Sequence, residues 1–327
     1  MALANVTIHS SQFPENVRRD LLHSLHTRQI THKFLYDSYK QAQKWLALHE
    51  ACSPSRTDPA CQAMYDRAFA DAAGRVLAPA VQILGLGCGG GQKDARLLSL
   101  LAGREKEVSY RPCDVSLALA LTARQTARQA VAHLPCDPLV CDLALADDLH
   151  EVFGPPGDAH TARLITFFGM LPNFEPELIL PRLAALVRGE DWLLLSANLA
   201  PGPDYTAGVE RILPLYDNAL TREWLMTFLF DLGVERTDGE LRFVIETPPT
   251  APGLKRIAAY FDFRRRCEVR LEEQRFEFPA GDSIRLFFSY RHTPELVRAC
   301  LRKYELEWRG EWIARSGEEG LFLMVRA

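Results

Sequence analysis

The sequence lacks the cysteine pattern of a metal or redox centre. Its 8 cysteines are scattered over 327 residues, without a CxxC pair and without the regular spacing of zinc ligands. We therefore expect free thiols in a reducing compartment, and no bound metal.

A long apolar run and a strong net charge are also missing. No stretch reaches the length of a transmembrane helix, and no uninterrupted apolar segment opens the chain, which predicts a cytoplasmic protein. With 38 basic and 42 acidic residues, the formal net charge is -4, so the chain provides no basic field for nucleic acid. The sequence predicts no membrane partner, no nucleic-acid partner and no obligate protein partner.

Short apolar strands alternate with helical segments between residues 81 and 197. The strands are predicted at 81–84, 108–112, 138–141, 164–168 and 191–197. Such alternation predicts an α/β fold with a parallel sheet and helices on both faces. A predicted helix at 294–303 and a hairpin at 306–325 close the chain. This ending resembles that of a Rossmann-like class I methyltransferase sheet, where the last strand inserts antiparallel.

The flanking regions have a different pattern. Residues 1–75 are mostly helical in character, and apolar residues follow helical spacing from Thr31 to Ala51. The segment Pro201–Pro203 marks a boundary, after which strand character returns at 241–246, 267–278 and 284–290.

A glycine-rich segment, 85–91, joins the first strand to the following helix. Glycines let the backbone turn tightly and approach a ligand, and a helix N-terminus favours negative charge. Gly85, Gly87 and Gly90 match the G-x-G-x-x-G spacing, so the loop by itself could serve either NAD or S-adenosylmethionine (SAM).

Polar residues end the next three strands. Asp114 is placed to accept hydrogen bonds from ribose hydroxyls, Asp142 could hold an adenine amino group, and Asn173 lies in the loop after the fourth strand. Each acid alone could be a helix cap or a turn residue. The 114–116 turn and the closing hairpin favour SAM over NAD, and the chain has no recognisable constellation for hydride transfer.

Several segments together resemble the SAM-dependent, histidine-specific methyltransferase family. These are 33–37, the glycine loop with Lys93, 110–116, 167–174, 215–218 and 284–289. The resemblance implies a SAM-dependent enzyme that methylates a small molecule. It also implies a Rossmann-like SAM domain, 65–200 plus 289–327, and a smaller α+β substrate domain, 1–64 plus 201–288.

The resemblance assigns roles to individual residues. For the cofactor we expect contacts from Gly85, Gly87, Gly89, Lys93, Asp114, Val115, Asp142, Phe168 and Gly169. Tyr36, Asn173 and Tyr216 would hold the amino and carboxylate groups of an amino acid, and Ser289 would lie near its side chain. Tyr36 is also the residue that we expect to orient the acceptor amine.

The substrate residues depart from the family at an important position. The family has an acid two residues before the serine, paired with the substrate imidazole, and this chain has Phe287. Replacing a carboxylate by phenyl removes a charged hydrogen bond of about 1.5–3 kcal/mol. We therefore predict N-methylation of an amino acid other than histidine, although Asp282 could rescue a basic substrate. Histidine itself, another small nucleophile of secondary metabolism, and a non-catalytic binding protein remain alternatives.

Overall fold

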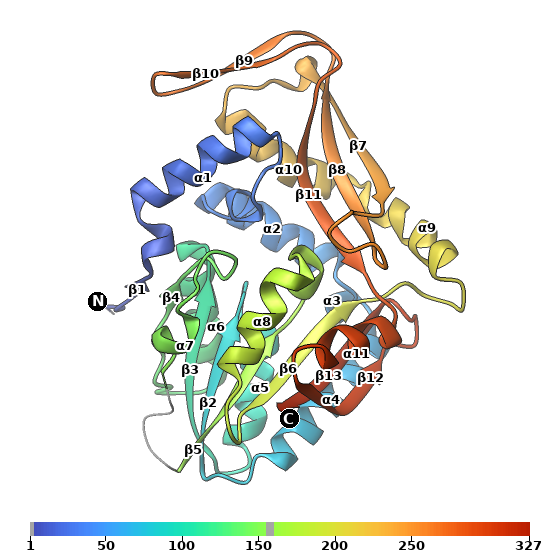
Figure 1. The fold of residues 1–327 in the computed structure, drawn as a ribbon. Helices are drawn as coiled ribbons and strands as arrows, with labels where there is room; N and C mark the ends of the chain where they lie inside the picture. Colours follow the sequence, from blue (N-terminus) through green and yellow to red (C-terminus); the bar gives the residue numbers. More distant parts are fainter. Residues whose placement is uncertain (1–2, 155–159) are drawn as a thin grey trace.

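The computed structural model describes residues 3–154 and 160–327 of the chain. A large sheet with helices on both faces forms the lower part of the molecule in Figure 1, and helices with a smaller sheet lie above it. This architecture confirms the predicted α/β fold of the class I methyltransferase type with a further α+β part. No helix in the described ranges is long and apolar enough to cross a membrane.

Within the described residues the large sheet has 8 strands, in the order β1-β4-β3-β2-β5-β6-β13-β12. The first six strands of this order run parallel, β13 is antiparallel to β6, and β12 is antiparallel to β13. The strands are β1 (Thr7–Ile8), β2 (Ala80–Leu86), β3 (Glu107–Asp114), β4 (Leu139–Val140), β5 (Thr161–Phe167), β6 (Trp192–Asn198), β12 (Leu306–Ile313) and β13 (Glu319–Arg326). The antiparallel insertion of β13 is the ending that the sequence predicted.

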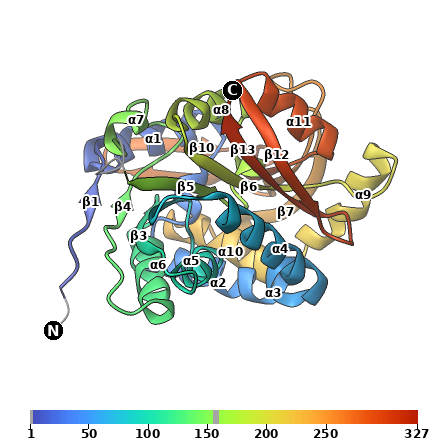
Figure 2. The ribbon, with the colours of Figure 1, turned by 90° about the horizontal axis from the view of Figure 1, so that it is seen from below.

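Helices cover both faces of this sheet, as Figure 2 shows. One face carries α4 (Pro59–Arg75), α5 (Gln92–Ala102) and α6 (Leu117–Ala130), and the other carries α7 (Leu149–Val152), α8 (Pro176–Leu186) and α11 (Pro294–Arg302). Leu193 and Leu195 of β6 pack into one core and Leu194 packs into the other. Because both faces are buried, the strands are apolar throughout rather than alternating.

A further core forms around the smaller sheet, whose antiparallel order is β11-β8-β7. Its strands are β7 (Gly239–Glu246), β8 (Lys255–Phe263) and β11 (Ser283–Arg291), with a hairpin of β9 (Cys267–Leu271) and β10 (Gln274–Phe278) beyond them. The helices of this part are α1 (Pro14–Thr27), α2 (Tyr39–Cys52), α3 (Pro54–Thr57), α9 (Tyr205–Tyr216) and α10 (Ala219–Asp231). Single 3-10 turns are η1 (Ser10–Gln12), η2 (His32–Leu35), η3 (Leu171–Asn173) and η4 (Arg236–Asp238).

The helical segment predicted from Thr31 to Ala51 is interrupted in the structure. It consists of η2, a break, and α2, which begins at Tyr39. Ser38 caps α2 by accepting from the Gln41 backbone N–H at 3.2 Å, and the Gln41 side chain accepts from the Ser38 N–H at 3.0 Å. This capping box starts a new helix, and Tyr36 falls in the break before it.

Three further features were not predicted. The stretch 267–278 is a two-stranded hairpin, and β1 adds to the edge of the large sheet beside β4. A bulge between Arg285 and Phe287 shifts the register of β11 against β8.

The predicted division between residues 64 and 65 lies inside α4, and the division into two domains stays a prediction.

Candidate functional site

The glycine loop after β2 approaches two neighbouring elements closely. Gly87 and Gly89 have φ values of 63° and 53°, in the left-handed region that favours glycine. A Cβ atom at Gly87 would lie 2.5 Å from the Met170 side chain, and one at Gly89 would lie 2.7 Å from the Trp45 ring. At Gly85, a Cβ would lie 2.5 Å from a buried carboxylate oxygen of α5. The loop therefore tolerates no side chain at these predicted cofactor positions.

Asp114, at the end of β3, holds this loop in place. Its Oδ2 accepts from the Gly89 backbone N–H at 2.9 Å, and its Oδ1 accepts from the Ser116 N–H at 3.0 Å. Burial raises the pKa of Asp114 to about 6, against the lowering effect of these N–H donors. Each oxygen keeps a second acceptor site, so the carboxylate can still receive hydroxyl donors.

Asp142, just after β4, has one carboxylate oxygen without a hydrogen bond. Oδ1 accepts from the Ala144 backbone N–H at 2.9 Å, whereas the buried Oδ2 accepts no hydrogen bond. Lys33 from η2 lies 3.5 Å from Oδ2 but donates to Asp20 at 2.5 Å. The Ser11 hydroxyl accepts from the Asp142 N–H at 3.0 Å. Burial raises the pKa of Asp142, and Lys33 opposes this shift.

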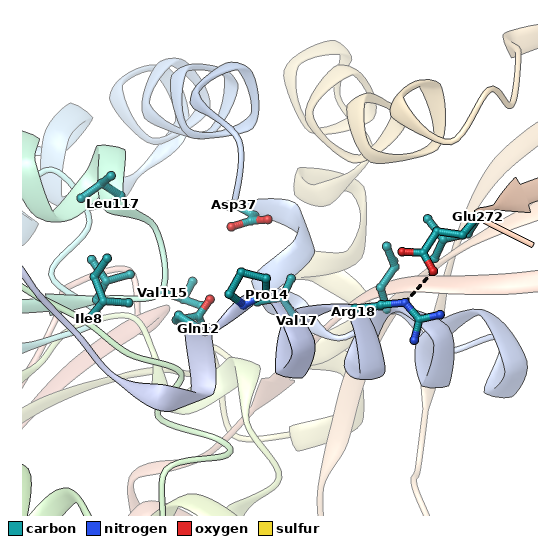
Figure 3. Close-up of a pocket in the computed structure, with 12 residues that line it drawn as sticks. Ile8, Gln12, Pro14, Val17, Arg18, Asp37, Val115, Leu117 and Glu272 are labelled. Carbon is teal, nitrogen blue, oxygen red and sulfur yellow. Dashed lines mark hydrogen bonds and ion pairs between the residues drawn. The ribbon is translucent and has the colours of Figure 1, made fainter.

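A cavity of about 470 Å³ lies beside these strand ends, between α1 and the edge of the large sheet. Val115, Leu117 and Val140 form apolar walls, and Asp37 lies at its border (Figure 3). At the far end, Arg18 of α1 pairs with Glu272 of the β9–β10 hairpin at 2.6 Å. Of the predicted cofactor residues, Val115 lines this cavity.

The other predicted cofactor residues make contacts within the protein. Lys93 donates to the Tyr65 hydroxyl at 2.7 Å and lies 3.4 Å from Glu319. The Phe168 ring packs 5.9 Å from the Tyr65 ring, and the Gly169 N–H donates to a serine hydroxyl of β6 at 2.8 Å. Lys93 and Phe168 thus both contact Tyr65, and their cofactor roles stay predictions.

Four of the predicted substrate residues lie together between the two parts of the molecule. The Tyr216 hydroxyl donates to Ser289 Oγ at 2.8 Å, and the Tyr216 ring lies 6.1 Å from the Phe287 ring. The Trp224 ring of α10 lies between Phe287 and Tyr36, with ring-centroid distances of 5.6 Å to Phe287 and 5.4 Å to Tyr36. The result is an aromatic wall beside two hydroxyl groups.

Asn173 is the fifth predicted substrate residue and belongs to η3, which packs against β11. Its backbone N–H donates to the Met170 carbonyl at 2.9 Å. Its side-chain amide makes no hydrogen bond with the described residues, so both its donor and acceptor are free for a ligand.

Burial raises the pKa of Tyr36, and the negative charge of Asp114 and the proximity of Tyr216 add to the shift. The phenol is therefore protonated at neutral pH. It can accept a hydrogen bond or donate one, but it does not act as a phenolate base.

Sequence reasoning missed several residues of this region. Trp45 and Trp224 face Tyr36, and Arg291 donates to the Tyr216 hydroxyl at 2.7 Å. Two-residue alternation from Phe287 through Ser289 could have pointed to Arg291, because strand residues two apart share a face. Asp282, considered as a substitute acid, instead pairs with Arg28 at 2.8 Å.

Solved structures with related folds share little sequence with this chain. Magnesium protoporphyrin IX methyltransferase from Synechocystis, with bound S-adenosylhomocysteine, has 14% identity and a TM-score of 0.46, and the match covers 89% of this chain and 96% of that one. A possible exported protein from Bordetella parapertussis has 12% identity and a TM-score of 0.48, covering 95% and 87%. No match was found among curated proteins.

A family model extends over nearly the whole sequence. It is described as a histidine-specific, SAM-dependent methyltransferase, and it matches residues 17–326. The matched range includes the glycine loop, both strand-end acids and all five predicted substrate residues. The chain therefore belongs to the SAM-dependent, histidine-specific methyltransferase family, which confirms the methyltransferase activity and the SAM cofactor predicted from its sequence.

Proposed function

We propose that this enzyme transfers a methyl group from SAM to the amine of a free amino acid other than histidine, one with an apolar or aromatic side chain. The observation that supports this substrate is the surrounding of Phe287, which is 7% exposed and packs among Tyr216, Trp224 and His32. Among the described residues, no carboxylate forms a hydrogen bond with the Ser289 or Tyr216 side chain. An imidazole there would lack its charged hydrogen bond, whereas an apolar side chain would gain aromatic contacts.

The residues at the strand ends fit SAM. The left-handed backbone at Gly87 and Gly89 lets the loop turn tightly at the strand end, under the Met170 and Trp45 side chains. Asp142 Oδ2 accepts no hydrogen bond and is only loosely paired with Lys33, at 3.5 Å, so it suits a buried amino group, and the apolar cavity wall at Val115 suits a flat heterocycle. We assign ribose recognition to Asp114.

Gly85, Lys93, Phe168 and Gly169 complete the proposed cofactor set. Lys93, held by Tyr65, fixes the start of α5 directly after the loop. When bound, SAM supplies a methyl group that its sulfonium already activates, so the protein contributes mainly alignment.

Three residues hold the amino-acid backbone in this proposal. Asn173 and Tyr216 contact the amino and carboxylate groups, and Tyr36 orients the acceptor amine through its neutral phenol oxygen. The amine must lose a proton before it offers a lone pair, and water carries that proton away. We further propose that 65–200 plus 289–327 hold the cofactor and that 1–64 plus 201–288 recognise the substrate. The described structure contains free cysteines, which supports a reducing, cytoplasmic location.

A methylation screen tests the substrate class. The free amino acids and a set of simple amines are each incubated with enzyme and SAM, and methylated products are detected by mass spectrometry. We expect the best substrate to be an apolar or aromatic amino acid.

The family match supports histidine as the second candidate. Histidine as the best substrate would overturn the role given to Phe287. Calorimetric titration with SAM, S-adenosylhomocysteine and NAD provides a check that does not depend on turnover, and we expect binding of the first two alone.

A further inference from the structure

Arg291 differs from the other buried arginines of the described structure. Arg163 is neutralised by Asp191, and Arg256 pairs with Glu175 at 3.0 Å. Arg291 is 7% exposed and forms no ion pair with any described residue. It is therefore a buried positive charge for which the described residues supply no counterion.

The guanidinium donates only to neutral groups. Nη1 donates to the Leu199 carbonyl at 3.2 Å and more weakly to the Glu318 carbonyl at 3.5 Å, and Nη2 donates to the Tyr216 hydroxyl at 2.7 Å. The buried Nε has no acceptor. One donor direction of the guanidinium is thus unused, and a second N–H of Nη2 is not accounted for by these bonds.

An unpaired buried charge is unfavourable, and arginine cannot relieve it by losing its proton. Carbonyl and hydroxyl dipoles offset part of the cost but do not provide a full negative charge. The two other buried arginines show that this chain pairs such charges with acids elsewhere. The arrangement at Arg291 is typical of a site whose anion arrives with a ligand.

The position of Arg291 indicates which ligand that is. Phe287, Ser289 and Arg291 alternate along β11, and Tyr216 contacts all three. Where the family places an acid, this face begins with phenyl and ends with a guanidinium. The one charged group among these three residues is the Arg291 guanidinium, so this face favours a ligand with an anionic group beside an apolar one.

We propose that Arg291, together with the Tyr216 hydroxyl, binds the α-carboxylate of the amino-acid substrate, whose side chain then lies against Phe287. This inference rests on the proposed function and adds the orientation of the substrate. A guanidinium recognises a planar carboxylate through parallel N–H donors, which the tyrosine, asparagine and serine of the site cannot provide.

The test compares three forms of one substrate. The best amino acid from the screen is offered to the wild type beside its carboxamide and its decarboxylated amine. The same series is repeated with Arg291→Met and Arg291→Lys, after thermal unfolding has shown that both variants are folded. We expect the wild type to prefer the acid, and Arg291→Met to raise KM for the acid about 10- to 100-fold while KM for the amide stays within threefold. Arg291→Lys should retain part of the preference.

Arg285→Gln is the matched control, because it removes one positive charge from the same strand and Arg285 contacts Gln29 rather than the site. It should leave the preference for the acid unchanged. An acid preference that survives in Arg291→Met overturns the inference and leaves the proposed function intact. A wild type that methylates none of the free amino acids overturns the proposed function, and the inference with it.

Discussion

At the scale of single residues, the carboxylate of Asp114 connects two strand ends. It accepts from the glycine loop after β2 and from the turn after its own strand. Both donors favour the ionised form, yet burial outweighs them and the pKa is raised to about 6. The residue that we assign to ribose recognition therefore titrates just below neutral pH.

SAM affinity should depend on this titration. Below pH 6 the Asp114 carboxyl gains a proton and loses one of its acceptor sites, so the dissociation constant should rise about tenfold for each pH unit. Calorimetric titration of SAM between pH 5 and pH 8 measures the effect. Asp114→Asn should bind more weakly with no such slope, and a wild-type dissociation constant that is flat over this range would contradict the assignment.

Substrate preference should depend on position 287. Phe287→Glu restores an acid two residues before Ser289, and the charged hydrogen bond should raise kcat/KM for histidine about 10- to 100-fold. Kinetics with histidine and with the best apolar amino acid check the exchange of preference. Phe287→Leu, which removes the ring without adding charge, should give no gain with histidine. An equal gain in both variants would rule out the charge as the cause.

At the scale of elements, the loops between strands and helices carry the site, and their geometry depends on close packing. The loop after β2 passes under Met170 and Trp45, which belong to the β5–α8 connection and to α2. The loop after β5 carries Asn173 and is attached to the smaller sheet. Glu175, the N-cap residue of α8, accepts from the Tyr290 hydroxyl at 2.6 Å and pairs with Arg256 at 3.0 Å.

Gly89→Ala tests the packing of the glycine loop. Left-handed backbone costs a residue with a Cβ about 1–2 kcal/mol, and the new methyl group would lie 2.7 Å from the Trp45 ring. We expect lower stability in urea unfolding and at least tenfold weaker SAM binding. Gly233→Ala is the control, because φ is 83° there but no atom lies within 4 Å. Its stability should fall by the backbone cost alone, with SAM binding unchanged.

Glu175→Gln tests whether the smaller sheet positions Asn173. Losing the charge weakens the attachment of the loop, so KM for the amino acid should rise about 3- to 10-fold, with SAM affinity unchanged. Steady-state kinetics and calorimetry measure the two quantities. Glu177→Gln removes a charge from the first turn of the same helix, at an exposed pair with Lys303. Equal effects in both variants would point to a general change in α8 instead.

At the scale of the whole molecule, the proposed site lies between the large sheet, with a hydrophobic core on each face, and the core of the smaller sheet. Strand ends of the large sheet supply the proposed cofactor residues, while the break before α2, together with α9, α10 and β11, supplies the aromatic wall. β11 also joins the two parts, since Leu199 and His292 form a bridge beyond its last residue. We expect a ligand bound at this junction to contact residues from both parts.

Cofactor binding should therefore stabilise the whole chain. SAM at 100 times its dissociation constant adds about 2.7 kcal/mol to the free energy of unfolding, which corresponds to a rise in Tm of about 4 °C for a protein of this size. Differential scanning calorimetry with SAM, and with NAD at the same concentration as the control, measures the shift. An equal shift with NAD would argue against specific SAM recognition.

The alternation of strands and helices, the glycine loop and the two strand-end acids were readable from the sequence. They depend on local rules: strand and helix periods, glycine conformation, and the common edge at which parallel strands end. The same rules put Phe287 and Ser289 on one face of a strand. Hence the sheet, the order of its elements and the edge of the sheet at which the proposed site lies followed from residues close together in the chain.

Packing between distant segments could not be read in this way. β1 joins the sheet edge, Lys33 approaches Asp142 across more than a hundred residues, and a helix break exposes Tyr36 to Trp224. Whether a buried charge has a partner also depends on every neighbouring segment at once. The sequence by itself determined the fold class through its local patterns, and it indicated the cofactor and the candidate residues when those patterns were combined with the family resemblance. Only the tertiary structure decided that Arg291 is buried with no counterion among the described residues, because that depends on which segments pack around it.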